Sequence, residues 1–273
     1  MIAPVLVKSP EVVPSFFGGG EQRLFGIYHV PHGAAIRDHG IVLCYPGPQE
    51  YSQVHWAYHK LASMLAKLGF HVFRFDYSAT GDSLGTSDEV SLANWAEEIG
   101  TAAAELRGIA GVRRVSLVTA RLGSALALRA IEAGLKARDV VLWDPITSGS
   151  EYVRILDAME DLRLRNTNFP EPDSRVPGEL LGYPFPDRVR KEISAVNLLT
   201  EAVGKPKRVL VVSAQITGAQ KALGKRLSDA GAVVTEMEVA DPALYSPGRH
   251  PNEPLLSHNI PMAIVDFLVR DSE

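Results

Sequence analysis

Short apolar segments recur along the chain and alternate with segments of helical periodicity. Six of them are rich in β-branched and aromatic residues and are apolar on both faces, which is typical of strands in a parallel sheet covered by helices. These predicted strands are residues 41–45, 71–75, 115–119, 140–143, 209–213 and 233–239. Near the start, residues 12–17 and 23–30 flank a glycine-rich turn and predict a β-hairpin.

Between these strands, apolar residues recur with a period of about 3.6, as in an amphipathic helix. In one such segment they are Leu61, Met64, Leu65 and Leu68. The predicted helices are residues 56–68, 91–107, 122–135, 151–165, 219–230 and 260–269. Strands that alternate with helices in this way predict an α/β fold: a mostly parallel sheet of eight strands with right-handed crossovers and helices on both faces.

One connection is much longer than the others. Residues 146–206 separate the strand at 140–143 from the strand at 209–213, and they include a proline-rich stretch at 169–186. Long excursions inside a compact domain are uncommon and tend to be functional. We therefore expect residues 146–206 to form a cap insertion after the sixth strand of the sheet, counted from the hairpin, within a single domain that spans residues 1–273.

Composition excludes several classes of protein. The 273 residues are 46% hydrophobic and 22% charged, with a net charge of −4, which argues against disorder and against a basic nucleic-acid-binding stripe. No apolar run approaches the roughly 18 residues of a membrane span, and the first residues do not resemble a secretory signal. The single cysteine, Cys44, cannot form an internal disulfide or a thiolate metal site. We expect a cytoplasmic protein with no metal or cofactor and no nucleic-acid partner, and a homodimer is left open.

The clearest chemical motif is the junction of a strand and a helix at residues 115–124. Its five central residues are Thr119, Ala120, Arg121, Leu122 and Gly123. They align with G-x-S-x-G, the strained turn that exposes a nucleophilic serine, and Arg121 stands at the central position.

Together with residues 41–48 and 74–83, this junction resembles the α/β-hydrolases over nearly the whole chain. More narrowly, the chain resembles serine-aminopeptidase-like hydrolases and the hydrolase-like proteins associated with exosortase or biosynthetic gene clusters. Some of those proteins carry Arg-Leu-Gly at the turn and Leu-Trp-Asp-Pro, here residues 142–145. The resemblance implies the α/β-hydrolase fold and a role beside a biosynthetic pathway.

Arginine is permanently protonated and cannot attack a carbonyl carbon, so acyl-enzyme chemistry at Arg121 is excluded. An oxyanion hole could persist, with the backbone N–H of Leu122 and that of Gly47 or Gln49 as donors. The arginine would then make a cationic pocket for a carboxylate, phosphate or enolate. Alternatively, it forms an ion pair with an acid. The candidates for that acid are Asp144, Glu50 and Asp82.

The remaining triad positions are incomplete. Of two histidines before the last helix, His250 suits the position of the general base better than His258. No acid follows the strand at 209–213, and Asp144 follows the preceding strand. Cys44, inside a strand, and Ser124, along the helix, are poor replacements for the nucleophile.

We therefore expect Arg121, His250 and Glu50 to carry any chemistry, with Glu50 as partner of the arginine or as general base. The expected substrate-binding residues are Gly47, Gln49, Tyr51, Leu122 and Asp144. The leading hypothesis is a protein that binds a small acyl or carboxylate-bearing molecule, with cyclase-, epimerase- or lyase-type chemistry or with none. The alternatives are an ester, thioester or peptide hydrolase that uses activated water, and a non-catalytic scaffold.

Overall fold

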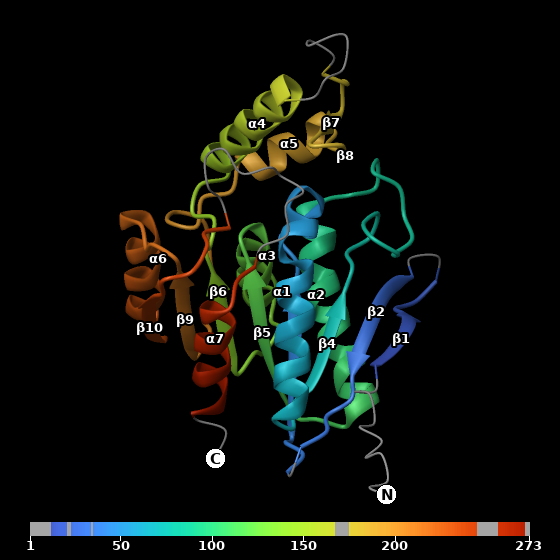
Figure 1. Ribbon diagram of the computed structural model, residues 1–273, viewed down its shortest axis with the longest axis vertical. Helices are drawn as coiled ribbons and strands as arrows, with labels where there is room; N and C mark the ends of the chain where they lie inside the picture. The colour runs from blue at the N-terminus through green and yellow to red at the C-terminus, as the bar shows by residue number, and fades with distance from the viewer. Residues whose placement is uncertain (1–11, 21–22, 34, 167–174, 245–255, 271–273) are drawn as a thin grey trace, which may run out of the picture.

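A twisted sheet of eight strands forms the centre of the molecule (Figure 1). The computed structural model describes residues 12–20, 23–33, 35–166, 175–244 and 256–270. The strand order is β1-β2-β4-β3-β5-β6-β9-β10, and β2 is antiparallel to both of its neighbours while the remaining pairs are parallel. The strands are β1 (Val12–Phe17), β2 (Leu24–His29), β3 (His39–Cys44), β4 (His71–Phe75), β5 (Arg114–Ala120), β6 (Asp139–Trp143), β9 (Arg208–Ser213) and β10 (Val233–Glu238). The predicted mostly parallel sheet of eight strands is confirmed.

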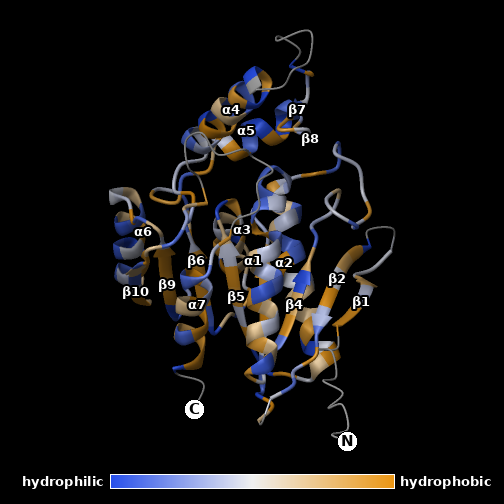
Figure 2. Ribbon diagram, in the orientation of Figure 1, coloured by the Kyte–Doolittle hydropathy of each residue, from blue (hydrophilic) through white to orange (hydrophobic). Residues whose placement is uncertain are grey.

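The described part of the chain contains seven helices. They are α1 (Pro48–Lys67), α2 (Leu92–Ala110), α3 (Leu122–Glu132), α4 (Gly149–Asn166), α5 (Asp187–Ser194), α6 (Gly218–Asp229) and α7 (Asn259–Val269). Helices α1 and α7 lie on one face of the sheet, and α2 and α3 pack together on the other (Figure 1). Covered on both faces, β3 is buried at every position, and the central strands are hydrophobic along their lengths (Figure 2).

The start of α1 differs from the prediction. The helix begins at Pro48 rather than at residue 56, because Gly47 turns the chain with φ 131° and a proline suits the first helical position, where its missing N–H is not needed. Gln49, Glu50 and Tyr51 therefore lie in the first turn of a helix. The predicted start of this helix at residue 56 was wrong, because it left these three residues outside the helix.

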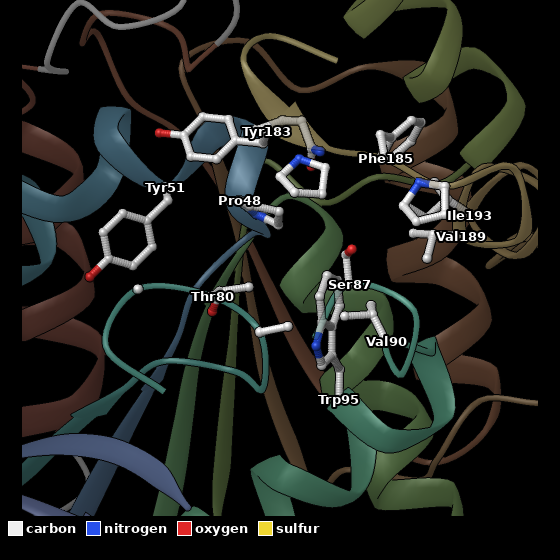
Figure 3. Close-up of a pocket in the computed structure, with 15 residues that line it drawn as sticks. Pro48, Tyr51, Thr80, Ser87, Val90, Trp95, Tyr183, Phe185, Val189 and Ile193 are labelled. Carbon is white, nitrogen blue, oxygen red and sulfur yellow. The ribbon is translucent and has the colours of Figure 1, made fainter. Parts of the chain in front are cut away.

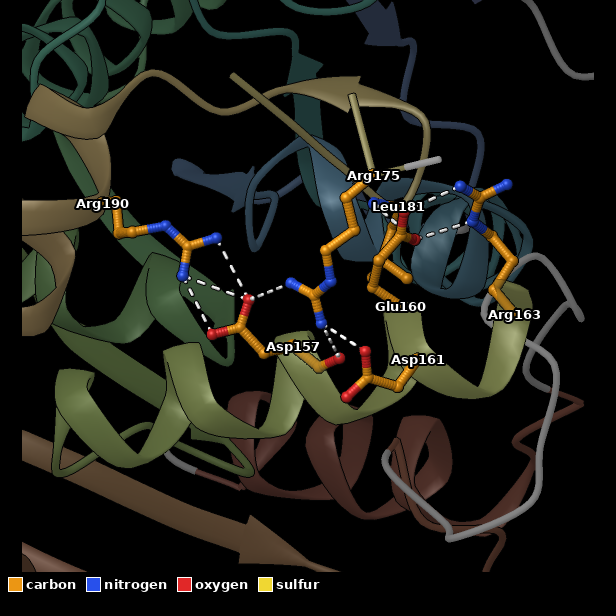
Figure 4. Close-up of polar contacts among 7 residues, drawn as sticks. All are labelled: Asp157, Glu160, Asp161, Arg163, Arg175, Leu181 and Arg190. Carbon is orange, nitrogen blue, oxygen red and sulfur yellow. Dashed lines mark hydrogen bonds and ion pairs between the residues drawn. The ribbon is translucent and has the colours of Figure 1, made fainter. Parts of the chain in front are cut away.

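The long connection between β6 and β9 contains α4, the two-residue strands β7 (Glu179–Leu180) and β8 (Tyr183–Pro184), and α5. Figure 1 places this α4–α5 segment beyond the carboxyl ends of the parallel strands. Ion pairs link α4 to the chain that follows it: Asp157 accepts hydrogen bonds from Arg190 and Arg175 (Figure 4). The sequence did not predict α5.

Helix α5 also docks on the start of α2. Arg188 donates to the carbonyl oxygens of Asp88 and Val90, and Glu192 accepts a hydrogen bond of 2.9 Å from the backbone N–H of Leu92. That N–H belongs to the first turn of α2, where helical N–H groups have no partner within the helix. The α4–α5 segment is thus held to the sheet-flanking helices by specific polar contacts.

At the opposite, amino end of the strands, a polar chain crosses the sheet interior. Ser116 of β5 donates to Asp139 of β6 at 3.1 Å, and His39 of β3 donates to Ser116 through Nε2 at 2.7 Å. His39 is fully buried, and burial lowers its pKa to about 4. The folded protein therefore keeps this imidazole neutral at pH values where the unfolded chain protonates it.

We predict that acid weakens the fold partly through His39. Because the folded pKa lies below the unfolded value of about 6.5, the free energy of unfolding should fall by up to ~1.4 kcal/mol per pH unit as the pH drops from 6.5 towards 4. Urea denaturation at pH 7 and pH 5 should show a smaller difference for His39→Gln than for the wild type. His32→Gln, at an exposed histidine, is the control. An unchanged pH dependence in His39→Gln would contradict the assignment.

Candidate functional site

Arg121 forms the whole connection between β5 and α3. Its backbone has φ 51° and ψ −121°, a strained conformation for a residue with a side chain. The turn is tight because α3 packs closely on the end of β3: a Cβ at Gly123 would lie 2.6 Å from the carbonyl oxygen of Tyr45. The small residue at position 123 is therefore required by packing, and the turn has the geometry expected from the sequence.

The Arg121 side chain is buried between two carboxylates. Its Nε donates to Oε1 of Glu50 at 3.0 Å, and its Nη1 donates to Oδ2 of Asp144 at 3.1 Å. Only 7% of the arginine side chain and 2% of the Glu50 side chain are exposed. The predicted ion pairing is confirmed for Glu50 and Asp144. Asp82, the third candidate, is bound through its backbone N–H to Asp76 instead.

Two residues that the sequence did not reveal complete this cluster. Tyr152 of α4 donates to Oε2 of Glu50 at 2.7 Å, and its ring centroid lies 5.6 Å from the guanidinium carbon of Arg121. Gln220 of α6 donates to Oδ1 of Asp144 at 2.8 Å. We refer to Glu50, Arg121, Asp144, Tyr152 and Gln220 as the elbow cluster. The third guanidinium nitrogen of Arg121, Nη2, has no hydrogen-bond partner among the described residues.

The electrostatic balance of the elbow cluster is one cation against two carboxylates. Burial alone would lower the pKa of the Arg121 guanidinium, but Glu50 and Asp144 outweigh it and raise that pKa above its ordinary value. Burial, together with the neighbouring Glu50, raises the pKa of the Tyr152 hydroxyl far above its ordinary range. The arginine charge is thus already compensated within the protein, and Glu50 is engaged by two donors.

Neither alternative nucleophile is accessible. Cys44 is buried in β3, and burial raises the pKa of its thiol. Ser124 is fully buried, and its hydroxyl lies 2.9 Å from the Thr119 hydroxyl. Both residues are placed as the sequence predicted, in the interior and away from solvent.

A polar cleft of about 430 Å³ opens beside the elbow cluster, lined by Arg121, Asp144, Tyr152 and Gln220 and by the chain that follows β6 and β9. Of the two candidate histidines, His250 lies outside the described residues. His258 is exposed at the start of α7 and bonds Nζ of Lys60 through its Nδ1 at 3.0 Å. It makes no contact with the elbow cluster.

A second, apolar cavity of about 280 Å³ lies between the first turn of α1, the loop after β4 and the α4–α5 segment (Figure 3). Trp95, Phe185, Val189 and Ile193 contribute apolar surface, and Gln49 lines it from α1. Gln49 is 4% exposed, and its Nε2 has no hydrogen-bond partner among the described residues. We call this cavity the apolar pocket.

The other expected binding residues are distributed around these two spaces. Tyr51 lines the apolar pocket, but its hydroxyl donates to Asp76 at 3.0 Å and points away from the pocket (Figure 3). Gly47 precedes α1 and Leu122 begins α3, and a Cβ at Gly47 would lie 3.8 Å from a methyl carbon of Leu122. Their role as oxyanion donors stays a prediction.

The strand order, the tight turn after β5 and the helices on both faces define the α/β-hydrolase fold. No protein-family model matches the sequence, and a search of curated proteins found no relative.

Solved structures with this fold match most of the chain. An esterase from Pyrococcus furiosus is 15% identical, with 96% of this chain and 91% of that chain covered and a TM-score of 0.63. Est1E from Butyrivibrio proteoclasticus, solved with ferulic acid bound, is 14% identical, with coverage of 93% and 98% and a TM-score of 0.63. The mouse α/β-hydrolase domain-containing protein 10 is 17% identical, with coverage of 94% and 98% and a TM-score of 0.55. At these identities the likeness concerns the fold.

None of the helices in the described part of the chain combines the length and the apolar character needed to cross a membrane. The His, Cys, Asp and Glu side chains of the described residues form no group suited to holding a metal ion.

We predict that Arg121→Met lowers the free energy of unfolding by about 3–5 kcal/mol, because it leaves Glu50 buried without its cation. In a Glu50→Gln background, Arg121→Met should lower the free energy of unfolding by a smaller amount, because the buried charge at position 50 is no longer present. Urea denaturation of the two single variants and the double variant measures this coupling. Arg113→Met, at an arginine with an 88% exposed side chain, should have little effect. Equal losses at positions 113 and 121 would contradict the account.

Proposed function

We propose that this protein binds a small neutral acyl molecule in the apolar pocket and forms no acyl-enzyme at the turn after β5. The observation that carries the proposal is the elbow cluster. Arg121 stands where a hydrolase of this fold presents its nucleophilic serine, and its side chain is held between Glu50 and Asp144. A guanidinium has no nucleophilic electron pair at neutral pH, so that position cannot attack a carbonyl carbon.

The charge of the elbow cluster favours an acyl group over a carboxylate as the ligand. Two carboxylates already face Arg121, so a third anion would meet net repulsion. The apolar pocket, in contrast, offers hydrophobic walls and one unpaired amide donor, Nε2 of Gln49. Its volume of about 280 Å³ lies near the lower end of the range for small-molecule pockets, roughly 300–1,000 Å³. A short acyl chain with a carbonyl oxygen would satisfy both features.

Residues 146–206 would then act as a cap. Phe185, Val189 and Ile193 close one side of the apolar pocket, and each is almost fully buried. Through Tyr152 the same segment reaches the elbow cluster. A cap in this position shields a bound apolar ligand from water, which favours binding.

Catalysis without a serine is the second candidate. Asp144 keeps 20% of its side chain exposed in the polar cleft, where it could assist a water molecule. An ester hydrolase of this kind would also need a base such as His250. The scaffold function and the biosynthetic role implied by the family resemblance stay predictions.

The absence of an acyl-enzyme is tested with a fluorophosphonate probe, which labels activated serines. We expect no labelled serine, and no turnover of a panel of p-nitrophenyl esters above the buffer rate. A hydrolase of this fold with a serine at the turn serves as the positive control. Probe attached to any serine of this chain would refute the proposal. Turnover that disappears in His250→Ala would instead support hydrolysis by activated water.

The apolar pocket is tested through Gln49. Because the Nε2 of Gln49 is buried without a hydrogen-bond partner among the described residues, Gln49→Leu should leave the free energy of unfolding unchanged or raise it. The affinity for ethyl esters of four- to eight-carbon acids should fall about tenfold, since one hydrogen bond to the ligand carbonyl is lost. Titration calorimetry measures the affinity. Gln215→Leu, in the polar cleft, should not change it. A loss of affinity in Gln215→Leu alone would place the ligand in the polar cleft and would contradict the proposal.

A further inference from the structure

A second, chemically different surface lies at the other end of the parallel strands. The neighbouring strands β5, β6 and β9 begin with Arg114, Asp139 and Arg208 at the amino edge of the sheet. Asp139 and Arg208 are paired in register, and Arg114 lies two residues before Ser116, the β5 residue level with Asp139. Together with the loops that enter these strands, they line an open groove of about 1300 Å³. Seven residues of β5, about 20 Å at the usual rise, separate this edge from Arg121.

This groove is strongly cationic. Eight of its fifteen lining residues are arginine or lysine, and only Glu132 and Asp139 are acidic. The whole chain, in contrast, has a net charge of −4. The positive charge is therefore concentrated at one place on an otherwise acidic protein, and we call this surface the basic groove.

The carboxylate at the floor of the basic groove does not neutralise it. Asp139 is almost fully buried and is already bound by Nε of Arg208 at 2.7 Å and by the hydroxyl of Ser116 at 3.1 Å. This arrangement fixes one guanidinium of the floor in place. Arg138 also lies 3.6 Å from Asp139, and Arg113 is paired with Asp38 at 2.8 Å. The groove's other cations are Arg107, Arg114 and three lysines.

Several of those cations have no acidic partner. Lys136, Lys205 and Lys207 are exposed and form no ion pair with any residue that the structure describes. Arg107 donates to the carbonyl oxygen of Lys136. Arg114 donates to the backbone carbonyl oxygen of Asp38, whose carboxylate also interacts with the Arg114 charge.

Outside the basic groove, surface cations are paired with carboxylates in at least two places. Arg129 lies 2.8 Å from Glu201, and Lys225 lies 2.7 Å from Asp229. Unpaired cations that gather in one groove repel one another and attract mobile anions.

We propose that the basic groove binds an oligophosphate, a chain of two or more phosphate groups. A row of flexible lysines and forked arginines matches several phosphate oxygens at once. None of the fifteen lining residues is aromatic, so the groove offers no aromatic ring on which a nucleobase could stack. The recognised chemistry is therefore the phosphate chain, either free or at the end of an organic molecule.

The test measures binding of inorganic tripolyphosphate and of ATP by titration calorimetry. Lys205→Gln combined with Lys207→Gln should weaken tripolyphosphate binding about tenfold, and an increase from 50 to 200 mM NaCl should weaken binding to the wild type. Equal affinities for the two ligands would indicate that the groove recognises the phosphate chain whether or not it is attached to an organic molecule. Preference for tripolyphosphate would indicate a free chain. Both results support the proposal.

The matched control is Lys191→Gln combined with Lys221→Gln, which removes the same charge from exposed positions outside the groove. It should bind tripolyphosphate like the wild type. Equal loss in the two double variants would show general attraction to net charge and would overturn the proposal. So would binding of a DNA duplex without any binding of tripolyphosphate.

Discussion

The cost of burying a charge governs this structure at the turn after β5. A guanidinium can leave water only if carboxylates and hydrogen bonds replace its hydration, and removing one partner strands the other. Arg121 meets this requirement through Glu50 on α1 and Asp144 after β6, which Tyr152 and Gln220 hold in turn. Four separate stretches of chain are thereby fixed around one side chain. The shape of the space available to a ligand follows from that arrangement.

The sheet and most helices were predictable because their signals are local. Strands buried on both faces are mostly apolar, and β4 was predicted with the bounds that the structure gives. Two elements were not predicted well. The first turn of α1, Pro48 to Tyr51, lacks an apolar stripe, and its start depends on the φ of Gly47. Helix α5 is short and polar, and its position is set by contacts with α2 that are distant in sequence.

The candidate site was partly predictable. A strand that runs directly into a helix marked the turn at Arg121, and the cost of an unpaired cation pointed to Glu50 and Asp144. Tyr152 carried no such signal, since its link to Glu50 spans 102 positions in the chain. The two cavities escaped prediction for the same reason, because each is assembled from segments that meet only in the fold. The basic groove is built from three short basic segments, residues 113–114, 136–138 and 205–208, which are far apart in the sequence and meet only in the fold, so the overall composition did not reveal it.

The elbow cluster also limits the order in which mutations can accumulate. Serine in place of Arg121 would leave Glu50 and Asp144 facing each other without a counter-charge. Asp144 can be neutralised first, because a one-to-one pair of Glu50 and Arg121 remains. Positions 50, 121 and 144 are thus epistatic, and an evolutionary path between an arginine and a hydroxyl at this turn must pass through a defined sequence of intermediates. Homologues should show these three positions changing in concert.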